Sequence, residues 1–337
     1  MKAGALHNLY VRKSLQLAVI LLAKTSCFVP ETIGRVCAGF LGLAAYIASP
    51  RRSYLFATID RVYHRAGKPL PQPVSIIVKR LFLHYALTGY ELFRGSLYNN
   101  ALIEEIFDFD GWENVEKALK QKKGLILVVP HIGNWELLGT AITQRGYKLH
   151  SFVVGDQKKS ILGEPLNFLR MHSGITLHDR DRASTGALRA LKNGEILAMI
   201  ADQDGGALGI YCDFLKHWVS IPAGPANWSL KTGAPIIPVY CLRIGNSRRF
   251  RAIFFKPLPI ETAQTHEMRM LSRTKKILLW MEKVILQNPH QYLWFYDRFR
   301  PRHEAHIAKL KQAGEQMVHG EMVRGGCLRL HTVSQVS

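Results

Sequence analysis

The stretch GLILVVPHIGNWELLG, residues 124–139, indicates how the chain folds. Its first half is an apolar run of the length and composition of a buried strand. The run ends abruptly on His131, after which Gly133 permits a tight turn and Asn134 is a good N-cap for a helix. A buried strand that passes through a glycine turn into a helix is the unit from which α/β sheets are built.

The same alternation continues through the middle of the chain. The predicted strands are Leu125–Val129, His150–Val154, Ile196–Ala201, Pro235–Leu242 and Phe250–Phe255. The predicted helices are 73–98, Trp112–Lys123, Ala183–Lys192, Asn227–Lys231 and Glu267–Leu286. This order predicts an α/β fold with a mixed sheet that helices cover on both faces.

The composition indicates a folded, strongly basic protein. The 337 residues are 47% hydrophobic, which is too apolar for a disordered chain, and 45 Lys and Arg against 25 Asp and Glu give a net charge of +20. Residues 1–100 contain 13 basic and only three acidic residues, and therefore half of that net charge. Because these basic residues alternate with apolar runs, they favour an anionic membrane surface over nucleic acid as the partner.

Two apolar stretches near the N-terminus carry this pattern. Leu15–Ala23 and Val36–Ala48 have basic flanks, and each is shorter than the roughly 20 residues that span a bilayer. We expect a membrane attachment that is monotopic or single-pass; the alternative is that both helices are buried in a soluble core. The predicted organisation is a membrane-associated segment at 1–52, a catalytic α/β domain at 53–302 and a polar tail at 303–337.

A histidine and a carboxylate at the end of the first predicted strand indicate chemistry. His131 and Glu136 are on opposite sides of the strand–helix turn, so the carboxylate is expected to reach the imidazole and raise its basicity. No G-x-S-x-G nucleophile is present, so the base would act on a hydroxyl of the substrate, in acyl or glycosyl transfer. The alternative is a structural histidine. No metal site is predicted, since position i+4 is Trp135.

A second polar cluster follows the predicted strand at Ile196. Asp202 and Asp204 lie in ILAMIADQDGG, and polar groups at the ends of parallel strands converge on one crevice. Taken alone, Asp-x-Asp is also typical of a glycosyltransferase that holds Mg²⁺ and a nucleotide sugar. Arg170, in NFLRMHSG, is a candidate for binding a phosphate or stabilising an oxyanion.

These motifs, in this order, resemble the bacterial lipid A biosynthesis acyltransferases of the lauroyl and myristoyl type, within the lysophospholipid acyltransferase superfamily. The resemblance covers about Ile33 to Arg300. It rests on His131-x-x-x-x-Glu136, ADQD at 201–204 and the stretch PAGPANWSLKTGAPIIPVY, with LGLAAYIASPRRSY before them and NPHQYLWFYDRFR after them.

The resemblance implies an enzyme on the cytoplasmic face of the inner membrane. It would move a fatty acyl chain from the thioester of acyl carrier protein to a hydroxyl of a lipid A precursor or related glycolipid, without a cofactor. His131 would be the base and Glu136 its partner, with Arg170, Asp202 and Asp204 near the substrate. The alternative acceptors are a lysophospholipid or another glycolipid. Apolar residues from Leu125–Val129 and the aromatic cluster Tyr292, Trp294, Phe295 and Tyr296 would line the acyl pocket, unless they are core.

Overall fold

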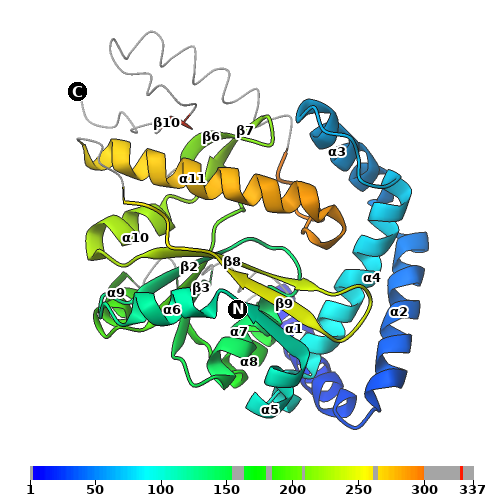
Figure 1. Ribbon diagram of the computed structural model, residues 1–337. Coiled ribbons are helices and arrows are strands. Elements are labelled where there is room, and N and C mark those ends of the chain that lie inside the picture. The colour runs from blue at the N-terminus through cyan, green and yellow to red at the C-terminus, as the bar shows by residue number, and fades with distance from the viewer. Residues whose placement is uncertain are drawn as a thin grey trace.

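The computed structural model describes residues 3–153, 163–179, 184–206, 209–260, 265–299 and 327–328. At its centre is a sheet with helices around it (Figure 1). This sheet has seven strands, in the order β1-β9-β8-β2-β5-β3-β4. The strands are β1 (Phe107–Asp110), β2 (Leu125–Val129), β3 (Leu149–Val153), β4 (Thr176–Asp179), β5 (Ile196–Ile200), β8 (Ile236–Arg243) and β9 (Phe250–Phe254). All neighbouring pairs are parallel except β8 and β9, so the predicted mixed sheet is confirmed.

Helices cover both faces of this sheet, as predicted (Figure 1). One face packs against α9 (Ser184–Lys192), α10 (Gly224–Thr232) and α11 (His266–Gln287). The other packs against α5 (Asn100–Ile106), α6 (Trp112–Leu119) and α7 (Trp135–Gln144), with α8 (Gly163–His172) beside β4. Strand β2 lies between β8 and β5, and all five of its residues are buried, which explains its unbroken apolar sequence.

A second, small sheet packs beside α11. It consists of β6 (Ile210–Phe214), β7 (His217–Ile221) and β10 (Cys327–Leu328), which are all paired antiparallel in the order β10-β6-β7. The predicted polar tail at 303–337 lies outside the described residues, except for β10.

The first four helices are α1 (Ala3–Ser26), α2 (Glu31–Ala48), α3 (Arg52–Arg65) and α4 (Val74–Phe93), and the 3-10 turn η1 (Gly95–Leu97) follows them. Helices α2 and α4 lie side by side (Figure 1). A Cβ added at Gly42 of α2 would lie 3.0 Å from the backbone of Phe82 and Leu83, so any side chain there would require the two helices to move slightly apart. Helix α2 thus packs on α4, within the predicted catalytic domain, and a boundary at residue 52 stays a prediction.

The N-terminal helices expose apolar side chains. Of the 16 large apolar side chains that lie exposed in the described chain, ten fall between residues 17 and 47, including Phe28, Phe40 and Leu41. Helix α2 has 18 residues and is, among the described helices, the one that passes a length and composition test for crossing a membrane. The helix is longer than the apolar stretch Val36–Ala48, because it also includes the five residues before Val36.

Candidate active site

His131 and Asp202 meet because of the register between two neighbouring strands. Strands β2 and β5 are parallel, with Val129 opposite Ile200, and each polar residue follows its strand end by two positions. The backbone nitrogen of His131 donates to Oδ2 of Asp202 at 3.0 Å, and the imidazole Nδ1 lies 2.7 Å from Oδ1. One carboxylate therefore fixes both the main chain and the ring of the histidine.

The protonation of this pair follows from the state of the aspartate. Burial alone would raise the pKa of the Asp202 carboxyl, but the charge of His131 and the hydrogen bonds that it donates outweigh burial and lower the pKa. The buried hydroxyl of Tyr292 also bonds to Asp202, and burial keeps the pKa of that tyrosine well above its usual value. Because the ionised carboxylate only accepts, Nδ1 of His131 is the donor, and Nε2 of the neutral ring carries a lone pair.

Glu136 is paired with a different residue from the one predicted. Its carboxylate accepts from Arg170, through Nε at 2.8 Å and through Nη2, and from the indole Nε1 of Trp135 at 3.1 Å. The expected contact between the Glu136 carboxylate and the imidazole was therefore wrong. The carboxylate beside the imidazole belongs to Asp202, which lies 71 residues after His131 in the sequence. Glu136 reaches His131 indirectly: the ring of Trp135 packs edge-on against the imidazole, with ring centroids 4.9 Å apart.

Arg170 keeps Glu136 ionised. Burial would raise the pKa of the Glu136 carboxyl, but the charge and hydrogen bonds of Arg170 lower it below its usual value. Burial likewise disfavours the charged form of Arg170, whose pKa is nevertheless raised by Glu136. The two therefore form a largely buried ion pair that supports Trp135, and both side chains line the cavity that His131 lines.

The turn between His131 and α7 is held by groups from several elements. Gly133 has a φ of 64°, and a Cβ there would overlap the carbonyl oxygen of Cys241, so the predicted need for glycine is confirmed. Asn134 is the N-cap, as predicted, and its side chain accepts from the backbone nitrogen of Leu137 at 2.9 Å. The carbonyl of Gly133 bonds to Nε2 of His84, 3.1 Å away.

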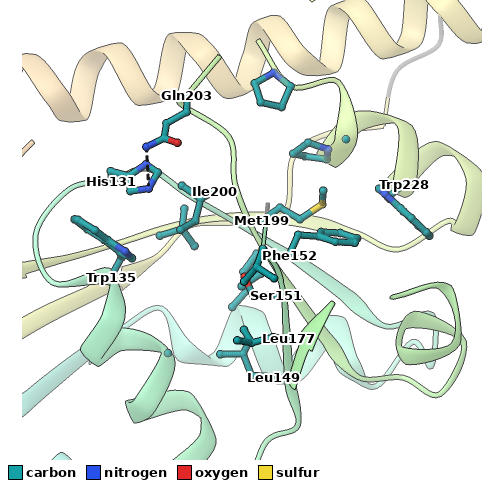
Figure 2. A pocket seen from close by; sticks show the side chains of 18 of the residues that line it. His131, Trp135, Leu149, Ser151, Phe152, Leu177, Met199, Ile200, Gln203 and Trp228 are labelled. Carbon is teal, nitrogen blue, oxygen red and sulfur yellow. Dashed lines mark hydrogen bonds between the residues drawn. The ribbon is translucent and has the colours of Figure 1, made fainter. Parts of the chain in front are cut away.

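Asp204 and its neighbour Gln203 lie at the same edge of the sheet. Asp204 accepts from the backbone nitrogen of Gly206 at 2.9 Å and lines the cavity that His131 lines. Nε2 of Gln203 lies 3.4 Å from Nε2 of His131, and Figure 2 shows the two side chains facing each other. Gln203 was not predicted, although it lies between the two aspartates that were.

A cavity of about 770 Å³ opens beside His131 and Trp135. It is possible because the sheet splits there: β3 and β5 pair only as far as Ser151 and Ala198, whereas β5 stays paired with β2 as far as Ile200. Residues on both sides of the split, including Ser151, Phe152, Met199 and Ile200, line the cavity (Figure 2).

The lining residues lie on both faces of the sheet, and we call the two parts of the cavity on these faces its arms. The arm beneath α7 is lined by Leu127, Leu138, Gly139, Ile142, Leu149, Ile175 and Leu177. The arm toward α10 is lined by Phe152, Met199, Pro225, Asn227, Trp228 and Met270. Leu127 and Val129 of the predicted apolar run contribute to the lining, whereas the aromatic cluster at 292–296 does not appear among its described residues. Tyr292 and Trp294 are core residues instead.

The chain is similar to acyltransferases of two kinds. It is 24% identical over 283 residues to the lipid A biosynthesis palmitoleoyltransferase of Escherichia coli (strain K12), a match that covers 82% of this chain and 85% of that protein. It is 28% identical over 180 residues to the phosphatidylinositol mannoside acyltransferase of Mycolicibacterium smegmatis, covering 52% of this chain and 59% of the relative. For the corresponding protein of Mycobacterium tuberculosis, the match covers 49% of that relative. The chain thus spans about half to three fifths of the mannoside acyltransferases that it matches.

The family model for the bacterial lipid A biosynthesis acyltransferases matches residues 1–301, which is most of the chain. The matched region includes the histidine–aspartate pair, the cavity and the apolar N-terminal helices. The chain belongs to the bacterial lipid A biosynthesis acyltransferase family.

Proposed function

We propose that the protein is a membrane-associated O-acyltransferase. It moves a fatty acyl chain from the thioester of acyl carrier protein to a hydroxyl of a lipid A precursor or a related glycolipid. The observation that carries this proposal is the His131–Asp202 pair at the mouth of an apolar cavity. A base beside an apolar pocket is what the transfer of an acyl chain to an alcohol requires.

In the proposed reaction, Nε2 of His131 accepts the proton of the acceptor hydroxyl as its oxygen attacks the thioester carbon. The C–O bond forms, the tetrahedral intermediate collapses and the C–S bond breaks. The imidazolium then returns its proton to the departing thiolate, so that the products are an ester and a thiol. Asp202 holds Nδ1–H and stabilises the imidazolium between the two proton transfers.

Glu136 and Arg170 have supporting roles in this mechanism. Their ion pair holds the indole of Trp135, which packs against the imidazole and limits its rotation. The ionised Glu136 also lies close enough to interact with the charge of His131. We therefore assign Glu136 to positioning and to stabilising the imidazolium, and Asp202 to direct contact with the base.

The arm beneath α7 is the proposed site of the acyl chain. It starts beside His131 and continues between apolar side chains of the sheet and of α7. A fatty chain needs an apolar pocket of this kind and no polar partner at its end. The thioester itself activates the carbonyl, so the proposal needs no cofactor. Acyl carrier protein is acidic, and a net charge of +20 favours its approach.

The exposed apolar face of α1 and α2 is the proposed membrane contact. Helix α2 packs on α4 through Gly34, Ala38 and Gly42, and its outward face carries Val36, Phe40 and Leu41. A helix that is packed along the body of the protein suits monotopic attachment, with its apolar side in the leaflet and basic residues at headgroup level. We place the enzyme at the inner membrane with its active site on the cytoplasmic face, where acyl carrier protein is available.

The geometry of Asp202 favours acyl transfer over the Asp-x-Asp glycosyltransferase alternative. Both oxygens of Asp202 already accept hydrogen bonds from His131, so the carboxylate serves the base. In a glycosyltransferase of that type the same oxygens would face a cation and a diphosphate.

The test is a transfer assay with purified full-length protein in membranes. Acyl carrier protein thioesters of several chain lengths are offered with lipid A precursors, lysophospholipids or a glycosylated phosphoinositide, and products are identified by mass spectrometry. We expect an acylated glycolipid, formed about 10²- to 10⁴-fold more slowly by His131→Ala. The matched control is His172→Ala, which removes an exposed histidine from α8. If only the lysophospholipid is acylated, the acceptor is a lysophospholipid and not the proposed glycolipid. Transfer of sugar from a nucleotide sugar would overturn the proposal.

A further inference from the structure

One buried carboxylate that has no role in the proposed mechanism contacts the turn between His131 and α7. Glu91 of α4 is 2% exposed and accepts four hydrogen bonds. Two come from Arg243 of β8, through Nη1 and Nη2, one from Nη1 of Arg35 at 3.0 Å and one from Nδ2 of Asn134 at 2.7 Å. This residue therefore joins α4, β8, α2 and the turn before α7.

Asn134 connects this cluster to the catalytic residues. Its side-chain oxygen caps α7 while its amide nitrogen donates to Glu91, so both ends of the buried amide are engaged. His131 lies three residues before Asn134 and Glu136 two residues after it. A shift of this amide would move the base and the start of the helix that carries Glu136.

The other side of the same turn is held by His84 of α4. Burial and the charge of Arg243 lower the pKa of His84 to about 3, so the ring is neutral at physiological pH. Its Nε2–H then donates to the carbonyl of Gly133. Glu91 and His84 lie seven residues apart on α4, which is about two turns of that helix. They form hydrogen bonds with the adjacent residues Asn134 and Gly133.

Arg35 brings α2 into this arrangement. Besides Glu91, its guanidinium donates to the carbonyls of Asn246 and Ser247 at 2.7 and 2.8 Å. The arginine reaches the buried carboxylate only because α2 lies close to α4, an approach that Gly42 allows. The helix with the exposed apolar face thus supplies one of the two cations around Glu91.

We propose that Glu91 is a positioning residue for acyl transfer, acting through Asn134, and that Arg35 makes this positioning depend on the docking of α2 against α4. The inference rests on the proposed function for its kinetic effects, but its structural consequence is measurable without activity. An N-terminal helix would then do more than attach the enzyme to the membrane: it would complete the support of the turn that carries the base.

The experiment compares Arg35→Ala, Arg35→Lys and Glu91→Gln with the matched control Arg248→Ala. Arg248 also ties α2 to the body, through Glu31, but this pair is exposed and does not involve Glu91. For Arg35→Ala and Glu91→Gln we expect kcat to fall about tenfold or more with KM within about twofold, because the base is misplaced while the pocket is intact. Arg35→Lys should recover part of kcat, and Arg248→Ala should resemble the wild type.

Hydrogen exchange followed by mass spectrometry gives the second readout. Peptides covering 131–140 should exchange faster in Arg35→Ala and Glu91→Gln but not in Arg248→Ala, because the cap of α7 is loosened. Folded Arg35→Ala and Glu91→Gln proteins with wild-type kcat and exchange would overturn the proposal, and a lower kcat without faster exchange would overturn the route through Asn134. If Glu91→Gln does not fold, the Arg35 variants decide, since Arg243 still pairs with Glu91 in them. A wild-type protein that transfers no acyl chain would refute the proposed function, while exchange would still test the positioning.

Discussion

At the residue scale, the site is defined by which carboxylate serves His131. The imidazole bonds directly to Asp202, whereas Glu136 acts across Trp135 and forms an ion pair with Arg170. The two carboxylates therefore have separable effects. Loss of Asp202 changes the tautomer and charge of the base, and loss of Glu136 changes the position of its neighbour.

We predict that His131→Ala reduces kcat by about 10²- to 10⁴-fold, the usual contribution of a positioned base. Asp202→Asn should cause a comparable loss, because an amide that faces Nδ1 can donate and then favours the wrong tautomer. The double variant should be little worse than His131→Ala alone, since the pair acts as a unit. Glu136→Gln should cost less than Asp202→Asn; the reverse order would show that Glu136 is the principal partner of the base. Melting temperatures of the same preparations separate loss of chemistry from loss of fold.

A second prediction concerns acid stability. The pKa values of Asp202 and Glu136 lie below their ordinary values of 3.8 and 4.5 in the folded protein. A carboxylate with a lowered pKa contributes stability that is present above its unfolded pKa and is lost as the pH falls through its folded pKa. The free energy of unfolding should therefore decline as the pH falls below about 5, and less steeply in Asp202→Asn. Urea unfolding between pH 3 and pH 7 measures both slopes, and equal slopes would mean that folding does not lower the pKa of Asp202.

At the scale of the elements, the long apolar segments were predictable and the strand order was not. Strands β2, β5, β8 and β9 lie within one or two residues of their predicted positions. For β2 and β8, burial on both faces explains the apolar runs that made them predictable. Four strands, β1, β4, β6 and β7, were not predicted, because polar residues interrupt their apolar ones. Sequence spacing also favoured Glu136 as the partner of His131. The true partner follows from the pairing of β2 with β5, which local sequence does not reveal.

Gly139 of helix α7 lines the cavity and leads to a prediction about acyl chain length. Gly139 is a helical glycine on the wall of the cavity arm, where a Cβ would lie 2.8 Å from Cδ1 of Ile175. Because glycine disfavours a helix interior by about 1 kcal/mol relative to alanine, its presence here is explained by the close packing of Ile175, which leaves no room for a Cβ. Gly139→Leu should fill the arm and shift the products toward shorter acyl chains, as measured by mass spectrometry. Gly89→Leu is the control, since a Cβ at that helical glycine meets nothing within 4 Å. An unchanged chain length in folded Gly139→Leu would place the acyl chain in the arm toward α10.

At the scale of the whole molecule, the apolar surface and the catalytic turn belong to one connected structure. Helix α2 presents Phe40 and Leu41 outward and sends Arg35 inward to Glu91. Deleting residues 1–48 would therefore remove both the proposed membrane contact and part of the support for the active site. Substitutions on the outward face of α2 separate the two effects.

We predict that Phe40→Asp with Leu41→Asp weakens membrane binding without lowering the melting temperature. Both side chains are 69% exposed, so their replacement leaves the core intact, whereas each carboxylate disfavours insertion into the apolar part of a leaflet. Ile260→Asp is the matched control, since that side chain is 86% exposed but lies far along the chain from α1 and α2. Binding is measured by flotation with vesicles that contain anionic lipid, at low and at high salt. Attachment through α2 predicts that the double variant stays in the soluble fraction at high salt while Ile260→Asp floats with the vesicles. A double variant that still floats at high salt would show that the protein binds the membrane through another surface.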